Sequence, residues 1–277
     1  MIRRSLLMAF AFVASGGFML QGAIAGGHES PIPPTEIAET PSIAEGDVVV
    51  VIGATGRTGR AAVAQLTDAG VTVRASARDL DKAKADISAD YDWVYVDVTE
   101  PDSIAAALEG ASYVISTIGN GRMPEEIDYQ GVANIVDAAV AAGTVKHMAL
   151  VSSAGVTHED HYLNKMFNNL LKWKLKGEDQ LRASGLNYTV VRPYGLLDEA
   201  DFDSISKHTS ILMDQGDDIN PNGLINRSDV ATVCIKSLTN PDANKKTFEV
   251  TNFLAFEPTK WEMQFGLMEE DAPMTAE

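Results

Sequence analysis

Three glycines at positions 53, 56 and 59 directly follow an apolar run, residues 48–52. Gly53 can make the turn that leaves a buried strand, Gly56 leaves room for a pyrophosphate to approach the backbone, and Gly59 lets the next helix pack on the strand. The N–H groups of that helix's first turn would then face the anion. The motif predicts a dinucleotide site that includes Thr55, Arg57 and Thr58, although a plain strand-turn-helix connection is the alternative.

An arginine stands where the second predicted strand should meet the adenosine ribose. Arg78 follows residues 71–77 and lies nineteen residues after Gly59. Sites for NAD(H) usually place an acidic residue there to bind the ribose 2′-hydroxyl, whereas an arginine suits a 2′-phosphate. Arg78, together with Arg57 near the phosphates, therefore favours NADP(H) over NAD(H). The alternative is that Arg78 only caps a solvated strand end beside Asp79.

Small or polar residues follow four more of the predicted strands, at the sheet edge where open α/β folds bind ligands. We expect Asp97 to contact the adenine, and we expect the small Gly119 to let the nicotinamide ribose approach. Any one of these residues could instead belong to an ordinary loop or cap. The prediction of a cofactor site therefore depends on their joint placement at one sheet edge. The cofactor candidates at these strand ends are Asp97, Val98, Thr117, Gly119, Ser152 and Pro193.

The elements that must position these residues alternate between strand and helix, which predicts a parallel sheet covered on both faces. Strands are expected at 48–52, 71–77, 93–96, 112–116, 147–152, 188–191 and 247–250, and helices near 57–69, 80–87, 101–109, 128–142, 163–184 and 228–239. The predicted fold is a Rossmann-type doubly wound α/β sheet, a single domain with a small C-terminal substrate-side portion. Residues 197–226 have weak periodicity and are expected to form a substrate-side lid.

The first 25 residues have the composition of an export signal, because Arg3 and Arg4 precede a mostly apolar stretch that ends in small residues. The arginine pair fits the twin-arginine route, which moves folded proteins and would let a cytoplasmic cofactor travel with the chain. An ordinary secretion signal and an uncleaved membrane anchor are the alternatives. Each of these readings predicts an exported, periplasmic or extracytoplasmic domain.

The remaining chain divides into a proline-rich linker (26–46), a nucleotide-binding domain (47–255) and a C-terminal helix with an acidic tail (256–277). The whole chain has a net charge of −17, and the part after the signal has −19, because the signal holds two arginines and no acids. This charge argues against nucleic acid and anionic membranes as partners. A small-molecule substrate or a protein partner is expected, with membrane contact only if the first segment stays uncleaved. No metal-ligand spacing occurs, and the single Cys234 is expected in the core.

With these motifs, residues 47–255 resemble the atypical branch of the short-chain dehydrogenase/reductase superfamily, the NmrA-like NAD(P)-binding proteins. The resemblance rests on the glycine turn, on Val96 to Thr99, on Val151 to Gly155, on 173–193 and on Arg227 to Ala231. The superfamily's usual chemistry needs a tyrosine four residues before a lysine, so that the ammonium lowers the phenol pKa and holds the nicotinamide ribose.

This chain departs from that pattern. Lys174 occupies the lysine's place, but Leu170 stands four residues earlier, and Tyr162 has Met166 where a lysine would be needed. Lys174 is expected to hold the ribose, unless it is merely a solvated lysine. A proton for reduction could come from water, from Tyr162, from neighbouring His161 or from the Ser152 hydroxyl.

The resemblance implies an oxidoreductase, and the catalytic candidates are Ser152, Lys174 and Tyr162. The first hypothesis is an NADPH-dependent reductase of a small carbonyl, quinone or flavin-like acceptor. Because the tyrosine is missing, the second hypothesis is a non-catalytic NADP(H) sensor or assembly factor. Epimerisation of a nucleotide sugar is weaker, since it depends on the same tyrosine.

Overall fold

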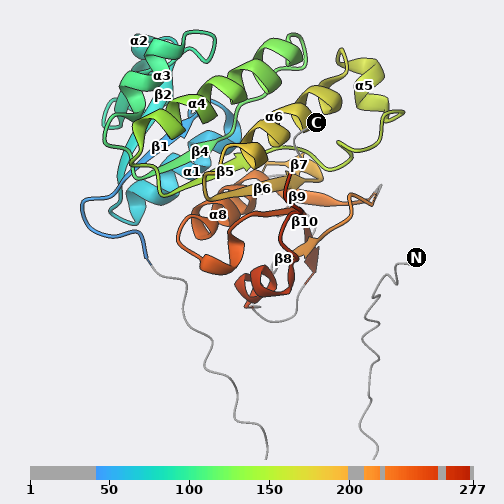
Figure 1. Cartoon of the computed structure of the whole chain (residues 1–277). Coiled ribbons are helices and arrows are strands. Elements are labelled where there is room, and N and C mark those ends of the chain that lie inside the picture. Colours follow the sequence, from blue (N-terminus) through green and yellow to red (C-terminus); the bar gives the residue numbers. More distant parts are fainter. Residues whose placement is uncertain (1–41, 199–208, 219–221, 255–259, 275–277) are drawn as a thin grey trace, which may run out of the picture. The chain divides into compact units, whose positions relative to one another are not determined.

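The computed structural model describes residues 42–198, 209–218, 222–254 and 260–274 (Figure 1). The predicted export signal, most of the predicted linker and part of the predicted lid lie outside the described residues. Within the described residues, no helix is both long enough and apolar enough to cross a membrane.

An eight-stranded sheet runs through the described residues in the order β3-β2-β1-β4-β5-β6-β10-β8. Its strands are parallel except β8, which pairs antiparallel with β10 at one edge. The chain order reverses between β1 and β4, and their carboxyl ends therefore form the crevice where such sheets bind ligands. The strands are β1 (Val48–Ile52), β2 (Thr72–Ala77), β3 (Asp92–Tyr95), β4 (Tyr113–Ser116), β5 (His147–Val151), β6 (Tyr188–Pro193), β8 (Thr209–Asp214) and β10 (Lys246–Leu254). This arrangement confirms the predicted α/β Rossmann-type fold.

Helices cover both faces of the sheet. α1 and α8 pack side by side on one face, and α3, α4 and α6 pack on the other, with α4 and α6 drawn above the sheet in Figure 1 and α8 below it. The helices are α1 (Arg57–Asp68), α2 (Leu80–Asp86), α3 (Pro101–Leu108), α4 (Val132–Ala142), α5 (Tyr162–Met166), α6 (Leu170–Ala183) and α8 (Arg227–Ser237), with a short η2 (Pro241–Ala243).

The apolar run that forms β1 explains the two-sided core. Val49 and Val51 belong to the core under α1 and α8, whereas Val50 and Ile52 belong to the core under α3 and α4. Successive side chains of a strand point to opposite faces, so a continuous apolar run fits only a strand buried on both sides. Cys234 of α8 is fully buried, and burial raises its pKa to about 12, which confirms the expectation of a core residue.

The prediction of one helix over 163–184 is wrong, because the chain breaks between α5 and α6. Asn168 and Asn169 adopt left-handed backbone angles, with φ of 52° and 61°. Asparagine tolerates this conformation better than other residues with a side chain. The buried Asn164 then accepts hydrogen bonds from the backbone N–H groups of Leu171 and Lys172, at 2.9 and 3.3 Å, and so satisfies the first turn of α6.

The helix predicted at 128–142 begins earlier and differently. A π-helix, η1 (Glu125–Gly131), leads directly into α4. π-helical turns are rare and occur frequently at functional sites, because the wider turn moves a side chain away from its ordinary α-helical position.

Part of the predicted lid is regular structure. β8 extends the main sheet, and β9 (Leu224–Asn226) pairs with β7 (Gly195–Leu197) in a small separate sheet. Residues 199–208 and 219–221 of that prediction lie outside the described residues. In the predicted C-terminal segment, η3 (Trp261–Leu267) is a 3₁₀ helix, and its buried Phe265 meets Phe248 of β10 edge to face.

Candidate functional site

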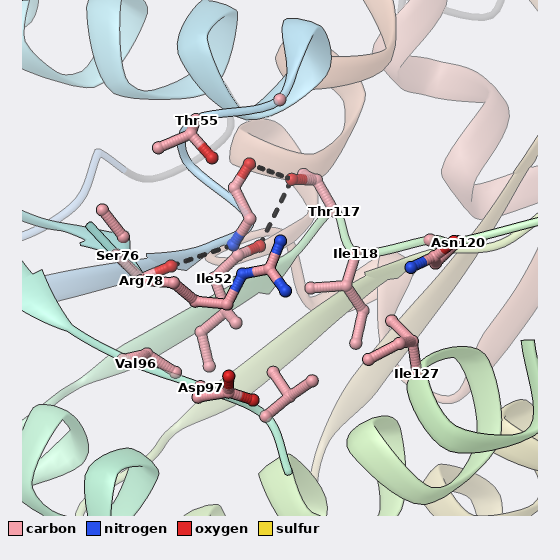
Figure 2. Close-up of a pocket in the computed structure, with 15 residues that line it drawn as sticks. Ile52, Thr55, Ser76, Arg78, Val96, Asp97, Thr117, Ile118, Asn120 and Ile127 are labelled. Carbon is pink, nitrogen blue, oxygen red and sulfur yellow. Dashed lines mark hydrogen bonds between the residues drawn. The ribbon is translucent and has the colours of Figure 1, made fainter. Parts of the chain in front are cut away.

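A cleft of about 200 Å³ opens at the carboxyl ends of β1, β2, β3 and β4 (Figure 2). Its walls come from the loops after these strands, which is the position expected for a dinucleotide in a doubly wound sheet. Eight of the predicted cofactor residues line it, namely Gly53, Thr55, Gly56, Arg78, Asp97, Val98, Thr117 and Gly119. Sequence reasoning missed the lining residues Ser76, Asn120 and Ile127.

The glycine turn at the end of β1 has no room for a side chain at Gly53 or at Gly59. Gly53 has φ of +88°, and a Cβ there would lie 2.8 Å from Thr117 Oγ1. A Cβ on Gly59 would overlap the Gly53 carbonyl oxygen and lie 2.8 Å from Ala54 Cα. Gly59 therefore permits α1 to pack against the turn. Gly56 is the N-cap of α1 and brings no side chain, so the N–H groups of the first helical turn are accessible to an anion. This geometry fits a pyrophosphate.

Two side chains hold the turn in place. The Gly53 N–H donates to Ser76 Oγ at 3.0 Å, and the Thr117 hydroxyl lies 3.2 Å from the carbonyl oxygens of both Ile52 and Gly53. These contacts, drawn as dashed lines in Figure 2, tie the carboxyl end of β1 to β2 and β4. Thr117 thus has a structural role in addition to lining the cleft.

Arg78 and Asp97 stand at the β2–β3 end of the cleft. Figure 2 shows the exposed Arg78 guanidinium extending over the cleft. Hydrogen bonds from Thr99 lower the pKa of Asp97, and the positive charge of Arg78 adds to this effect. Asp79 turns away from the cleft, because its carboxylate caps α2 by accepting the Lys82 N–H at 2.9 Å. The acid nearest to Arg78 in sequence is therefore occupied elsewhere.

Arg57 pairs with a carboxylate from a distant part of the chain. Its guanidinium lies 2.8 Å from Asp198, which also pairs with Arg227 at the start of α8 at 2.7 Å. Asp198 thus joins the glycine turn to the chain that leaves β7. Thr58 is buried in α1, and neither it nor Arg57 is among the residues that line the cleft.

Lys174 is held at the β4 end of the cleft and is not a solvated lysine. Its side chain is 13% exposed, and its ammonium lies 2.8 Å from the fully buried Asp128 carboxylate. Asp128 belongs to η1, and its other oxygen accepts the Asn120 N–H at 2.9 Å. A Cβ on Gly119 would lie 3.4 Å from the Lys174 ammonium, so the glycine leaves this charge close to the cleft. Sequence reasoning missed Asp128, and only the predicted burial of its helix could have suggested it.

Ser152 lies beyond the end of β5 and is 6% exposed. It lines a small cavity together with Lys174, Asp128 and Ile118, and Ile118 also lines the cleft. Pro193 ends β6 outside the cleft lining, and its carbonyl oxygen accepts the Ala154 N–H at 3.0 Å. The structure therefore brings Ser152 and Lys174 together next to the cleft. Pro193 instead joins the end of β6 to the loop after β5 through its carbonyl oxygen.

Tyr162 is on the surface. It begins α5, its side chain is 61% exposed, and its ring packs on His161 with centroids 4.7 Å apart. Burial lowers the pKa of His161, whose ring also packs against Gly155 in the loop after β5. These positions make Tyr162 a weaker candidate for proton delivery than the buried pair Ser152 and Lys174.

A buried ion network supports the loops behind the site. Arg192 of β6 contacts both carboxylate oxygens of Glu178 on α6, at 3.0 and 2.6 Å, and Glu249 of β10 at 3.1 Å. Glu249 in turn accepts the Asp217 N–H at 3.1 Å. The Asp217 carboxylate accepts N–H groups of the loop after β5, at Gly155 and residue 157. The network thus connects the helix that carries Lys174 to the loop that follows Ser152.

Comparisons with known proteins agree with this geometry. A model of a family described as NAD(P)H-binding matches residues 53–241. Sanguinarine reductase of Eschscholzia californica is 38% identical over 133 residues, which are 47% of this chain and 46% of that protein. The photosystem II assembly factor Ycf39 of Trieres chinensis is 27% identical over 208 residues, 72% of this chain and 62% of that protein. The chain thus spans about half to two thirds of the length of these curated relatives.

A solved structure has the same fold. ChuY, an anaerobillin reductase from Escherichia coli O157:H7, superposes with a TM-score of 0.61 at 25% identity and covers 76% of this chain and all of that one. The fold is therefore shared with a solved reductase. The chain belongs to the NAD(P)H-binding family of atypical, NmrA-like short-chain dehydrogenases/reductases.

Proposed function

We propose that this protein is an NADPH-dependent reductase of a small carbonyl, quinone or flavin-like acceptor. The observation that carries the proposal is the cleft that the glycine turn and Arg78 line, with the Lys174 ammonium of α6 next to it beside Gly119. Bound NADPH would supply the hydride. The similarity to two reductases, sanguinarine reductase and the anaerobillin reductase, supports the same class of reaction.

Arg78 supports NADP(H) over NAD(H). It is exposed and lines the β2–β3 end of the cleft, where the adenosine ribose would lie, whereas the Asp79 carboxylate caps α2 and Asp79 is not part of the cleft lining. A guanidinium forms two charge-assisted hydrogen bonds with a phosphate, and the 2′-hydroxyl of NAD(H) offers no comparable charge. The nucleotide would therefore be selected at Arg78 and held by the glycine turn.

The nucleotide preference is tested with Arg78→Glu. We expect NADPH binding to weaken by about 1–3 kcal/mol, the free energy of a hydrogen bond to a charged group, while NADH binding changes little. The matched control is Lys82→Glu, which makes the same charge change at an exposed position of α2 outside the cleft lining. Titration of both nucleotides by intrinsic fluorescence gives the result. Equal loss of NADPH affinity in both variants would remove Arg78 from the site.

The reductase activity itself is tested by NADPH oxidation with a panel of aldehydes, ketones, quinones and flavins. We expect turnover with at least one of these classes. A protein that binds NADPH but transfers no hydride to any of them would refute the proposal.

A specific observation favours a second function. Leu170 stands at the tyrosine's place, Tyr162 is on the surface, and the chain is similar to a photosystem II assembly factor. A non-catalytic NADP(H) sensor or assembly factor needs only the cleft. It predicts a partner protein whose affinity changes between NADPH and NADP⁺, and partner capture that is insensitive to the nucleotide would count against it.

A further inference from the structure

Three buried polar side chains meet beside the cleft in an arrangement that nucleotide binding alone does not require. Asp128, Lys174 and Ser152 line one small cavity, and its remaining walls are the apolar Ile118, Val132, Leu150 and Val151. The cavity has a volume of about 10 Å³. This is the space that a single water molecule, and hence one oxygen atom, occupies.

The Ser152 hydroxyl points to a ligand in this cavity. Its oxygen is fully buried, and it has no hydrogen-bond partner among the described residues. A buried hydroxyl without a partner costs about 1–3 kcal/mol, and the great majority of buried polar atoms are paired. An oxygen atom placed in the cavity would supply that partner.

The Asp128 carboxylate holds the positively charged Lys174 ammonium at this cavity. One of its oxygens contacts the Lys174 ammonium at 2.8 Å and the other accepts the Asn120 N–H, so the carboxylate is anchored at both ends. A lysine whose side chain is only 13% exposed would be costly to keep charged without such a partner. The π-helical turn places Asp128 there, since η1 carries it toward α6.

We propose that the oxygen atom of a carbonyl acceptor binds between Ser152 and Lys174, that Lys174 protonates it, and that Asp128 is the positioning residue for Lys174. This rests on the proposed reductase function and narrows its acceptor to an aldehyde, ketone or quinone. Ser152 donates a hydrogen bond to the acceptor oxygen. Lys174 takes the place of the tyrosine that the chain lacks.

The proton balance is simple. Hydride from NADPH brings two electrons and one hydrogen nucleus to the carbonyl carbon, and the C=O π electrons move to oxygen. The oxygen forms an O–H bond with a proton from the Lys174 ammonium, whose N–H bond breaks and leaves a neutral amine. Solvent then returns one proton to the amine. The sum is NADPH, carbonyl and one proton giving NADP⁺ and alcohol.

The proposal is tested with two flat three-ring acceptors that differ in their need for a proton. 9,10-Phenanthrenequinone needs hydride and proton, whereas the N-methylacridinium cation accepts hydride alone and becomes neutral. We expect Asp128→Asn to lower kcat for the quinone at least tenfold, with kcat for the acridinium and the Kd for NADPH within threefold of wild type. Asp137→Asn, at an exposed position of α4, is the matched control.

Ser152→Ala gives a second measurement if Asp128→Asn fails to fold. We expect kcat to fall for the quinone and not for the acridinium. The Tm should be unchanged, because the hydroxyl has no protein partner to lose among the described residues. Ser153→Ala, whose hydroxyl donates to the Ala154 carbonyl, is the control and should keep its activity.

The outcomes separate the two proposals. If Asp128→Asn or Ser152→Ala lowers kcat equally for both acceptors, or for neither, the proposed carbonyl site is overturned. The proposed reductase function is then unaffected. Wild-type protein that reduces the acridinium but no carbonyl compound also overturns the carbonyl site and not the reductase function. Wild-type protein that binds NADPH and reduces neither acceptor nor any member of the wider panel overturns the reductase function and the carbonyl site together.

Discussion

Gly59→Ala should damage the fold at the glycine turn, and Gly56→Ala should damage only nucleotide binding. A Cβ on Gly59 would overlap the Gly53 carbonyl oxygen and lie 2.8 Å from two other backbone atoms, which have no side-chain freedom to yield. Overpacking costs about 1–3 kcal/mol, and the cost should lie at the upper end here because all three close atoms belong to the backbone. Replacing a helical glycine returns about 1 kcal/mol, so we expect a net loss of about 2 kcal/mol. For a domain of this size that lowers the Tm by about 4–8 °C.

Gly56 is the matched comparison. Its backbone angles, φ −74° and ψ 163°, suit alanine, and its Cβ would meet only the Gly53 carbonyl oxygen, at 3.2 Å. We expect a nearly unchanged Tm but at least tenfold weaker NADPH binding, about 1.4 kcal/mol, because the methyl group would stand where the pyrophosphate approaches. Thermal unfolding by circular dichroism and NADPH titration measure the two effects. A Gly59→Ala protein with wild-type Tm, or a Gly56→Ala protein with wild-type affinity, would refute this account of the turn.

Two further predictions concern stability. Burial lowers the pKa of His147 to about 4, below its unfolded value near 6.5. The unfolded chain therefore binds the proton first, and the free energy of unfolding should fall by at most about 3 kcal/mol as the pH drops from about 6.5 to 4. Urea unfolding of His147→Gln should show a smaller fall over this range, and a pH profile identical to wild type would contradict the assignment. Arg192→Met should cost about 3–5 kcal/mol, because it leaves Glu249 buried without its cation, whereas Glu178 keeps its ion pair with Arg182 at 2.7 Å. Adding Glu249→Gln should recover part of the loss, and a Cm equal to wild type in the single variant would contradict this.

The sequence predicts the fold and the nucleotide end of the site well because their signals are local. The β-branched run before Gly53 and the spacing to Gly59 specify a strand, a turn and a helix within thirteen residues, 48–60. Parallel strands end at one edge, so residues such as Asp97 and Gly119 could be placed beside the turn without knowing any long-range contact.

The contacts of Lys174 could not be predicted in the same way. Asp128 and Lys174 are 46 positions apart, and their contact depends on a π-helical turn and on a helix break that Asn164 stabilises through its side chain. Neither feature has a periodic signature in the sequence. The ion pair between Arg57 and Asp198 could not be predicted either, since it joins residues 141 positions apart.

The ion network behind the site has an evolutionary consequence. Arg192 is the cation that Glu249 contacts, so a mutation of Arg192 alone leaves a buried carboxylate uncompensated, whereas Glu178 also pairs with Arg182. A lineage can lose Arg192 only together with Glu249 or through a weakened intermediate. Among relatives, positions 192 and 249 are therefore expected to covary, and the loop held by Asp217 should diverge most freely in lineages that have replaced both with apolar residues.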